Sequence, residues 1–113
     1  MTEYKVRVSI IIPHWNGIAI LSECLSSLAN TKHDSYEIIV VDNASTDGSQ
    51  SWIKNTHPQI KLIENEKNCG YAGGCNVGAL EAEGDYLVFL NNDTIQDPDW
   101  LQHLENFMEK DKV

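Results

Sequence analysis

The chain has 113 residues, which is enough for one domain with a single core and too short for two independent domains. Its 17 acidic residues outnumber the 8 basic ones and leave a formal net charge of −9. This charge argues against a nucleic-acid binder, because such proteins hold the phosphate backbone with clustered lysine and arginine side chains.

The first half of the chain alternates between strand-like and helix-like segments. A β-branched run at 6–12 predicts a buried strand that stops at Pro13. Apolar residues spaced by three and four predict a helix at 18–30, and a second apolar run predicts a strand at 36–41. A turn rich in helix-capping residues precedes a short helix that ends near Thr56, because Pro58 cannot continue it.

The second half repeats this alternation. Residues 60–64 predict a third strand, and a glycine-rich stretch at 70–78 opens a helix that continues to about 82. Residues 86–90 predict a fourth strand, and apolar spacing beyond Pro98 predicts a final amphipathic helix. Strands that alternate with helices imply right-handed crossovers. We therefore expect an α/β fold with a Rossmann-like, mostly parallel sheet of about four strands flanked by helices.

The apolar runs are much shorter than the roughly 20 residues that cross a bilayer. The first five residues also lack the pattern of a secretory signal. We therefore expect no transmembrane segment and a cytoplasmic location, which includes the inner face of the membrane. The three cysteines (Cys24, Cys69 and Cys75) lack CxxC spacing, which favours reduced thiols.

Polar side chains gather where the predicted strands end. In parallel sheets, ligands bind beyond the carboxyl ends of the strands, where the strand order reverses. One edge of the predicted sheet therefore carries the candidate chemistry. Its residues are His14, Trp15 and Asn16 after the first strand, Asp42 and Asn43 after the second, Asn68 after the third, and Asn91, Asn92 and Asp93 after the fourth.

Two carboxylates at strand ends, Asp42 and Asp93, each allow two interpretations. Asp42 either accepts from a base-edge N–H or ribose hydroxyl, or it caps the turn to Ser45 and Asp47. Asp93 either shares Mg²⁺ or Mn²⁺ with a nucleotide diphosphate, or it belongs to a plain Asn-Asn-Asp turn. Metal binding at Asp93 makes chemical sense, because a cation at this position would stabilise the charge on a departing diphosphate.

Glycines and aromatic residues at the same edge also leave alternatives open. The glycines at 70–78 allow a phosphate or sugar to approach the backbone, or let a helix pack closely on the sheet. Their spacing fits neither a dinucleotide fingerprint nor a P-loop. The four histidines lack metal-ligand spacing, and at this edge His14 has either a ligand role or none. Trp15 either stacks on a ligand or packs.

Four segments, in this order and spacing, resemble the successive blocks of family 2 glycosyltransferases. They are VSIIIPHWNG, IIVVDNASTDGS, NCGYAGGCNVG and LVFLNNDT, and the resemblance runs from about Val6 to Trp100. The residues in these segments are similar to those of the rhamnosyltransferase-like, cell-surface-polysaccharide branch of the family. The resemblance implies the N-terminal, nucleotide-sugar-binding half of a GT-A fold, and sugar transfer with inversion of configuration.

The same resemblance implies a role for each matching residue. Asp42 would accept from the pyrimidine ring of a UDP- or dTDP-sugar, and Asp93 matches the last carboxylate of the DxD motif that binds Mg²⁺ or Mn²⁺. The acceptor would be a hydroxyl group of a glycan. The residues expected to contact the nucleotide sugar are Pro13, His14, Trp15, Asn16, Asp42, Asn43, Asn68, Gly73, Gly74 and Asn92.

Two departures from the family limit these expectations. The DxD position reads Asn91-Asn92-Asp93, so one carboxylate remains and metal binding should depend on the diphosphate. The catalytic base of the family lies in its second half, and no residue up to Val113 is assigned as catalytic. General-base assistance accelerates a reaction by about 10²- to 10⁴-fold. Residues 1–113, taken as a single domain, should therefore bind the donor far better than they turn it over.

The rival expectations are a non-catalytic remnant and a signalling domain. A remnant would bind nucleotide or dimerise, and apolar surface left bare by the missing half predicts a homodimer. A phosphoacceptor signalling domain predicts paired acids after the first strand and a lysine at a late strand end. Neither is present in the sequence.

Overall fold

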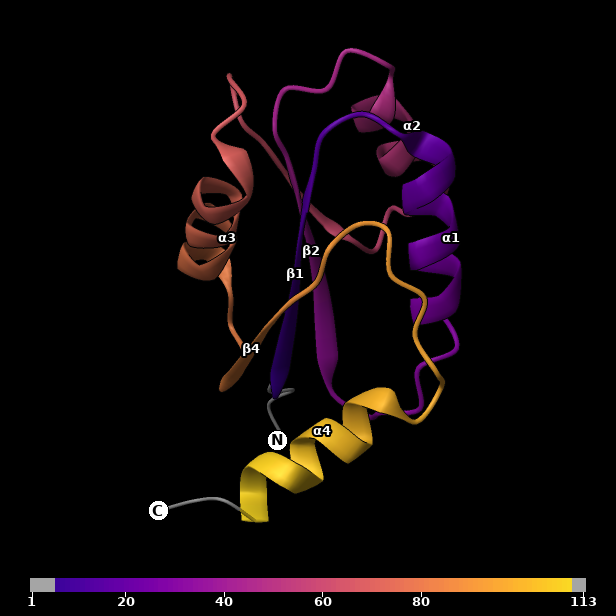
Figure 1. The fold of residues 1–113 in the computed structure, drawn as a ribbon, viewed down its shortest axis with the longest axis vertical. Helices are drawn as coiled ribbons and strands as arrows, with labels where there is room; N and C mark the ends of the chain where they lie inside the picture. The colour runs from indigo at the N-terminus through magenta and orange to yellow at the C-terminus, as the bar shows by residue number, and fades with distance from the viewer. Residues whose placement is uncertain (1–5, 111–113) are drawn as a thin grey trace, which may run out of the picture.

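The computed structural model describes residues 6–110 and shows one parallel sheet with helices on both faces (Figure 1). The expected α/β class is confirmed, and each predicted element is present. No helix among these residues is long and apolar enough to span a bilayer. The elements are β1 (Val8–His14), α1 (Ile18–Leu28), β2 (Tyr36–Asp42), α2 (Ser49–Thr56), β3 (Lys61–Glu64), α3 (Gly70–Glu81), β4 (Tyr86–Phe89) and α4 (Trp100–Lys110).

The four strands lie in the order β3-β2-β1-β4, and each pair is parallel. Val8 of β1 pairs with Tyr36 of β2 on one side and with Tyr86 of β4 on the other. The chain thus builds outward from β1 to β3 and then returns to the far side of β1. The strand order reverses between β1 and β4, so a crevice is expected at the carboxyl ends of these strands.

Strand β1 continues through Pro13, where the sequence predicted that it would stop. The backbone oxygen of His14 accepts from Asn43 on the β2 side at 2.8 Å, and that of Ile11 accepts from Leu90 on the β4 side at 2.9 Å. Because these bonds alternate, Pro13 turns its nitrogen toward β4. Strand β4 ends at Phe89, so the missing N–H of Pro13 falls just past the last paired residue of β4.

Side chains of β1 alternate between two cores. Ile10 and Ile12 join the larger core with α1, α2 and α4, whereas Ile11 joins a smaller core beneath α3. Figure 1 shows α3 alone on one side of the sheet. Helix α3 approaches closely at Gly78, where an added Cβ would lie 2.4 Å from Cγ2 of Ile11. The glycine is needed here for packing.

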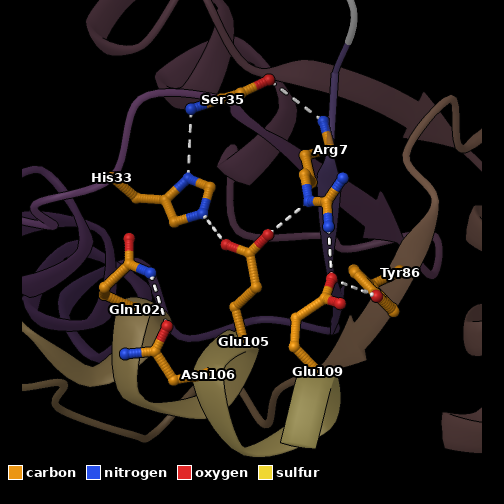
Figure 2. Close-up of polar contacts among 8 residues, drawn as sticks. All are labelled: Arg7, His33, Ser35, Tyr86, Gln102, Glu105, Asn106 and Glu109. Atoms are coloured by element: carbon orange, nitrogen blue, oxygen red, sulfur yellow. Dashed lines mark hydrogen bonds and ion pairs between the residues drawn. The ribbon is translucent and has the colours of Figure 1, made fainter. Parts of the chain in front are cut away.

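Helix α4 is held to the amino end of the sheet by a cluster of charged and aromatic side chains (Figure 2). Buried Glu105 accepts hydrogen bonds from Arg7 and His33. Glu109 accepts from Arg7 and, at 2.7 Å, from the hydroxyl of Tyr86. Because Arg7 precedes β1 and Tyr86 begins β4, this clamp lies at the opposite end of the sheet from the polar strand ends.

The clamp makes the stability of the fold depend on pH. Hydrogen bonds from His33 and then Arg7 hold the pKa of Glu105 below its ordinary 4.5, although burial acts in the opposite direction. A carboxyl group with a lowered pKa stabilises the fold above its unfolded pKa. This contribution is lost as the pH falls below 4.5 and through the folded pKa.

We expect Glu105→Gln to be less stable than wild type at neutral pH. The difference should shrink as the pH falls below about 4.5, since the wild-type carboxylate is then protonated too. Urea denaturation across this pH range measures the free energy of unfolding of both proteins. Glu66→Gln is the control, because Glu66 is exposed. A difference between Glu105→Gln and wild type that is constant with pH would contradict the role of Glu105.

Candidate functional site

A cavity of about 290 Å³ opens at the carboxyl edge of the sheet, beside the reversal of strand order. Its walls come from the ends of β1 and β2, from the start of α3 and from the segment after β4. Six of its eight lining residues belong to the predicted site, whereas Gly70 and Tyr71 do not. The lining residues are Pro13, His14, Trp15, Asn43, Asn68, Gly70, Tyr71 and Asn92.

His14 is buried at the base of this cavity and has a partner at each ring nitrogen. Its Nε2 lies 3.0 Å from Oγ of Ser49, and its Nδ1 lies 3.0 Å from Nδ2 of Asn92. Burial lowers the pKa of His14, and the charges of Asp42 and Asp47 oppose this shift only in part. The imidazole is therefore neutral near neutral pH. It links β1 to α2 and to the segment after β4.

Asn43 fixes the start of α3 against the sheet. Its Nδ2 donates to the backbone oxygen of Gly70 at 3.2 Å. Its Oδ1 accepts from Nδ2 of Asn65 at 2.9 Å and from the backbone nitrogen of Cys69 at 3.3 Å. These bonds place Gly70 and the adjacent Tyr71 at the cavity wall.

Asp42 does not line the cavity, which corrects the expectation that it contacts a ligand. Its side chain is fully buried. Oδ1 accepts from the Ser45 hydroxyl at 2.6 Å, while Oδ2 accepts from the Ser45 backbone at 3.0 Å and from Gln50 at 2.7 Å. Asp42 thus caps the turn after β2, and the next residue, Asn43, lies at the cavity instead.

Asn16 is also turned away from the cavity. Its Oδ1 accepts from the backbone nitrogen of Thr46 at 2.8 Å, and its own backbone nitrogen donates to Oγ of Ser45 at 2.8 Å. The φ angle of Asn16 is 48°, a left-handed conformation that asparagine tolerates. Asn16 therefore joins the loops after β1 and β2 and does not line the cavity, and its contact with a ligand stays a prediction.

Gly74 packs α3 against the sheet, which is the second of the two roles that the sequence left open for the glycines. An added Cβ at Gly74 would lie 2.9 Å from Cβ of Pro13, and one at Gly73 would lie 2.7 Å from Cβ of Cys69. Neither glycine lines the cavity. Gly74 thus lets α3 lie close to β1, so that its first turn reaches the ligand edge, whereas Gly73 leaves room for Cys69 at the start of the same helix.

Two aromatic side chains flank the cavity with much of their surface exposed. Trp15 is 53% exposed and Tyr71 is 49% exposed. Exposed aromatic rings beside carboxamide groups suit a flat ligand that also forms hydrogen bonds. Tyr71 was missed because only glycines were considered in its segment. The signal was an aromatic residue directly after Gly70 at the predicted ligand edge.

Asp93 is exposed and follows Asn92, which lines the cavity. Among residues 6–110 there is no group of three or more His, Cys, Asp or Glu side chains that could hold a metal ion. The oxygen atoms of Asp93 and its neighbouring carboxamides fit Mg²⁺ or Mn²⁺ by type. A cation here would need further oxygen ligands from the bound molecule.

Comparisons with known families and sequences match nearly the whole chain to glycosyltransferases. The family model described as Glycosyl transferase family 2 matches residues 9–113. The chain is 33% identical over 113 residues to poly(ribitol-phosphate) beta-glucosyltransferase of Bacillus spizizenii, covering 95% of the chain and 18% of that protein. It is 32% identical over 111 residues to the putative teichuronic acid biosynthesis glycosyltransferase TuaG of Bacillus subtilis, covering 96% and 44%.

Solved structures are similar over the same region. Staphylococcus aureus TarS 1–349 in complex with UDP has a TM-score of 0.83 and 27% identity, covering 93% of this chain and 32% of that one. The mannosyltransferase PcManGT of Pyrobaculum calidifontis, in complex with GDP-Man and Mn²⁺, has a TM-score of 0.86 and 28% identity, covering 97% and 34%. The chain thus spans less than half the length of each of these four proteins.

Proposed function

The chain belongs to glycosyl transferase family 2, and from this premise we propose that its cavity binds the donor of a sugar transfer. The donor is a nucleoside diphosphate sugar, and the acceptor is a hydroxyl group of a cell-surface glycan, with inversion at the anomeric carbon. The observation that carries the proposal is the cavity itself. It combines two exposed aromatic rings, Trp15 and Tyr71, with three carboxamides at the edge where parallel sheets bind ligands.

The cavity suits the nucleoside part of the donor. Its 290 Å³ is close to the lower end of the roughly 300 to 1,000 Å³ that ligand pockets occupy, so the rest of the donor extends beyond it. Trp15 and Tyr71 offer faces for the base, and Asn43 and Asn68 offer hydrogen-bonding groups. We propose a pyrimidine base, as in UDP or dTDP. Solved relatives hold UDP, UDP-GlcNAc and GDP-Man.

Asp93 is proposed to hold a divalent cation together with the diphosphate. The ion would supply positive charge to the departing nucleoside diphosphate. Asp93 itself supplies one anionic oxygen and directly follows Asn92, which lines the cavity. With a single carboxylate, the affinity for the cation depends on the nucleotide. The complex of PcManGT with Mn²⁺ supports this proposal.

The three free cysteines fit the cytoplasmic location proposed here. Cys24, Cys69 and Cys75 form no disulfide in the described part of the chain. A cytoplasmic enzyme at the inner face of the membrane would meet both a nucleotide sugar and a growing surface polymer. The names of the Bacillus relatives, which mention poly(ribitol-phosphate) and teichuronic acid, support a polymeric acceptor.

A second candidate function is a nucleotide-binding or dimerising module without catalysis. Apolar side chains on α3 and β4 favour it: Leu80 is 86% exposed, Leu87 40% and Phe89 43%. Strand β4 also forms one edge of the sheet. A homodimer that covers this surface is proposed. Sedimentation of the chain at micromolar concentration checks it, and a monomer throughout would refute it.

Titration calorimetry with UDP, dTDP and GDP, with and without Mn²⁺, tests donor binding. We expect UDP or dTDP to bind, and Trp15→Ala to weaken that binding about tenfold, since stacking of a base is worth about 1 to 3 kcal/mol. Thermal unfolding should change little, because Trp15 is 53% exposed. Consumption of the donor in the presence of acceptor glycan separates the enzyme from the binding module. If no nucleotide gives heat, donor binding fails, and only the dimerising form of the second candidate remains, which sedimentation tests.

A further inference from the structure

A directional chain of hydrogen bonds runs from the loop after β2 to the cavity. Asp47 begins it, because a carboxylate can only accept: Oδ1 accepts from the Ser49 hydroxyl, and Oδ2 accepts from the backbone nitrogen of Gly17 at 2.7 Å. Hydrogen bonds from Ser49 and Gly17 outweigh desolvation and lower the pKa of Asp47, so this carboxylate is charged near neutral pH. The single proton of the Ser49 hydroxyl is thereby committed to Asp47.

The next bond fixes the tautomer of His14. Since the Ser49 hydroxyl donates its one hydrogen bond to Asp47, its Oγ can only accept at 3.0 Å from His14, and Nε2 of His14 must carry the hydrogen. Burial keeps the ring neutral by lowering its pKa. A neutral ring with hydrogen at Nε2 has a bare lone pair at Nδ1.

The lone pair of His14 then sets the orientation of Asn92. The atom of Asn92 at 3.0 Å from Nδ1 must be a donor, so it is the amide nitrogen Nδ2. The oxygen Oδ1 of Asn92 makes no hydrogen bond with another described residue. Among residues 6–110 no buried side-chain oxygen lacks a partner, so Oδ1 is accessible. Asn92 lines the cavity.

We infer that His14 is a positioning residue that, through Ser49 and Asp47, holds the Asn92 carboxamide with its oxygen free to accept from a hydroxyl group of the bound nucleotide sugar. The inference rests on the proposed function of the cavity. Without the fixed tautomer, Asn92 could turn over and present two N–H donors. Such a reversal would replace an acceptor by a donor and select against a ligand hydroxyl that donates.

Ser49→Ala tests the chain without altering the cavity wall, because Ser49 is buried and does not line it. In metal-free buffer, the variant should bind UDP about three- to tenfold more weakly than wild type, the usual value of one hydrogen bond. In an Asn92→Ala background, the same substitution should change UDP affinity less than about twofold, since Ser49 acts on the ligand only through the Asn92 carboxamide. Ser51→Ala, at an exposed position on the same helix, is the matched control and should change neither.

Imidazole ¹⁵N NMR provides a second measurement that needs no nucleotide. In wild type, Nε2 of His14 should be protonated and Nδ1 bare, and Ser49→Ala should give a mixture of tautomers. A hydrogen on Nδ1 in wild type overturns the inference, as does an equal loss of UDP affinity from Ser49→Ala in both backgrounds. A loss seen only with Mn²⁺ also overturns it, since the oxygen would then serve the cation. Wild-type protein that binds no nucleotide overturns the proposed function, whatever the tautomer of His14.

Discussion

Replacing Asp42 by alanine is expected to lower the free energy of unfolding by about 3 to 5 kcal/mol. The carboxylate is fully buried and accepts three hydrogen bonds, two from Ser45 and one from Gln50. Removing it leaves those donors without a partner and opens a space at the end of β2. Urea denaturation followed by circular dichroism measures the loss.

Asp34→Ala is the matched control for this variant, because Asp34 is an exposed aspartate just before β2. It removes the same charge and should change the free energy of unfolding by less than about 0.5 kcal/mol. If Asp42→Ala proved as stable as Asp34→Ala but no longer bound nucleotide, Asp42 would be a ligand contact after all, and its assignment to the turn would be wrong.

Asp93→Ala is expected to remove the gain in nucleotide affinity that Mn²⁺ provides. The proposed site has one carboxylate, so its loss removes the only anionic ligand that the protein contributes. Two unit charges 4 Å apart attract by about 4 kcal/mol at an effective dielectric constant near 20. Part of this is offset when the ion loses water, and we expect UDP affinity with Mn²⁺ to fall on the order of 100-fold, or about 2.7 kcal/mol.

Calorimetry with UDP at saturating Mn²⁺ and in chelator measures this effect. Without metal, Asp93→Ala and wild type should bind UDP almost equally, because Asp93 does not line the cavity. Asp99→Ala removes the same charge from an exposed position further along the same segment, and it should retain the Mn²⁺ effect. A full Mn²⁺ effect in Asp93→Ala would place the cation elsewhere.

The fold could be predicted from the sequence because the local signals agree with one another. β-Branched runs and the apolar spacing of α1 each mark an element that the structure contains, and Pro98 marks the boundary before α4. The end of β1 was placed too early, since Pro13 is a poor strand residue in general. Its tolerance depends on β4 ending at Phe89, and the position of a neighbouring strand is not visible in the local sequence.

The ligand edge was predicted, but the direction of single side chains was not. Asp42 and Asn43 are adjacent, so they point to different sides, and which of them reaches the cavity depends on where β2 ends relative to β1. The partners of His14 could not be predicted either, since Ser49 and Asn92 contact it from 35 and 78 positions away. Contacts at such separations follow from topology rather than from a motif.

The clamp of Arg7, His33 and Glu105 and the cavity lie at opposite ends of the same sheet. For protein engineering, this separation offers a region where thermostability can be raised without touching recognition. Well-packed apolar residues can match or exceed a buried ion pair in stability. Libraries aimed at a new donor can therefore vary the carboxyl edge on a scaffold already reinforced at the amino edge.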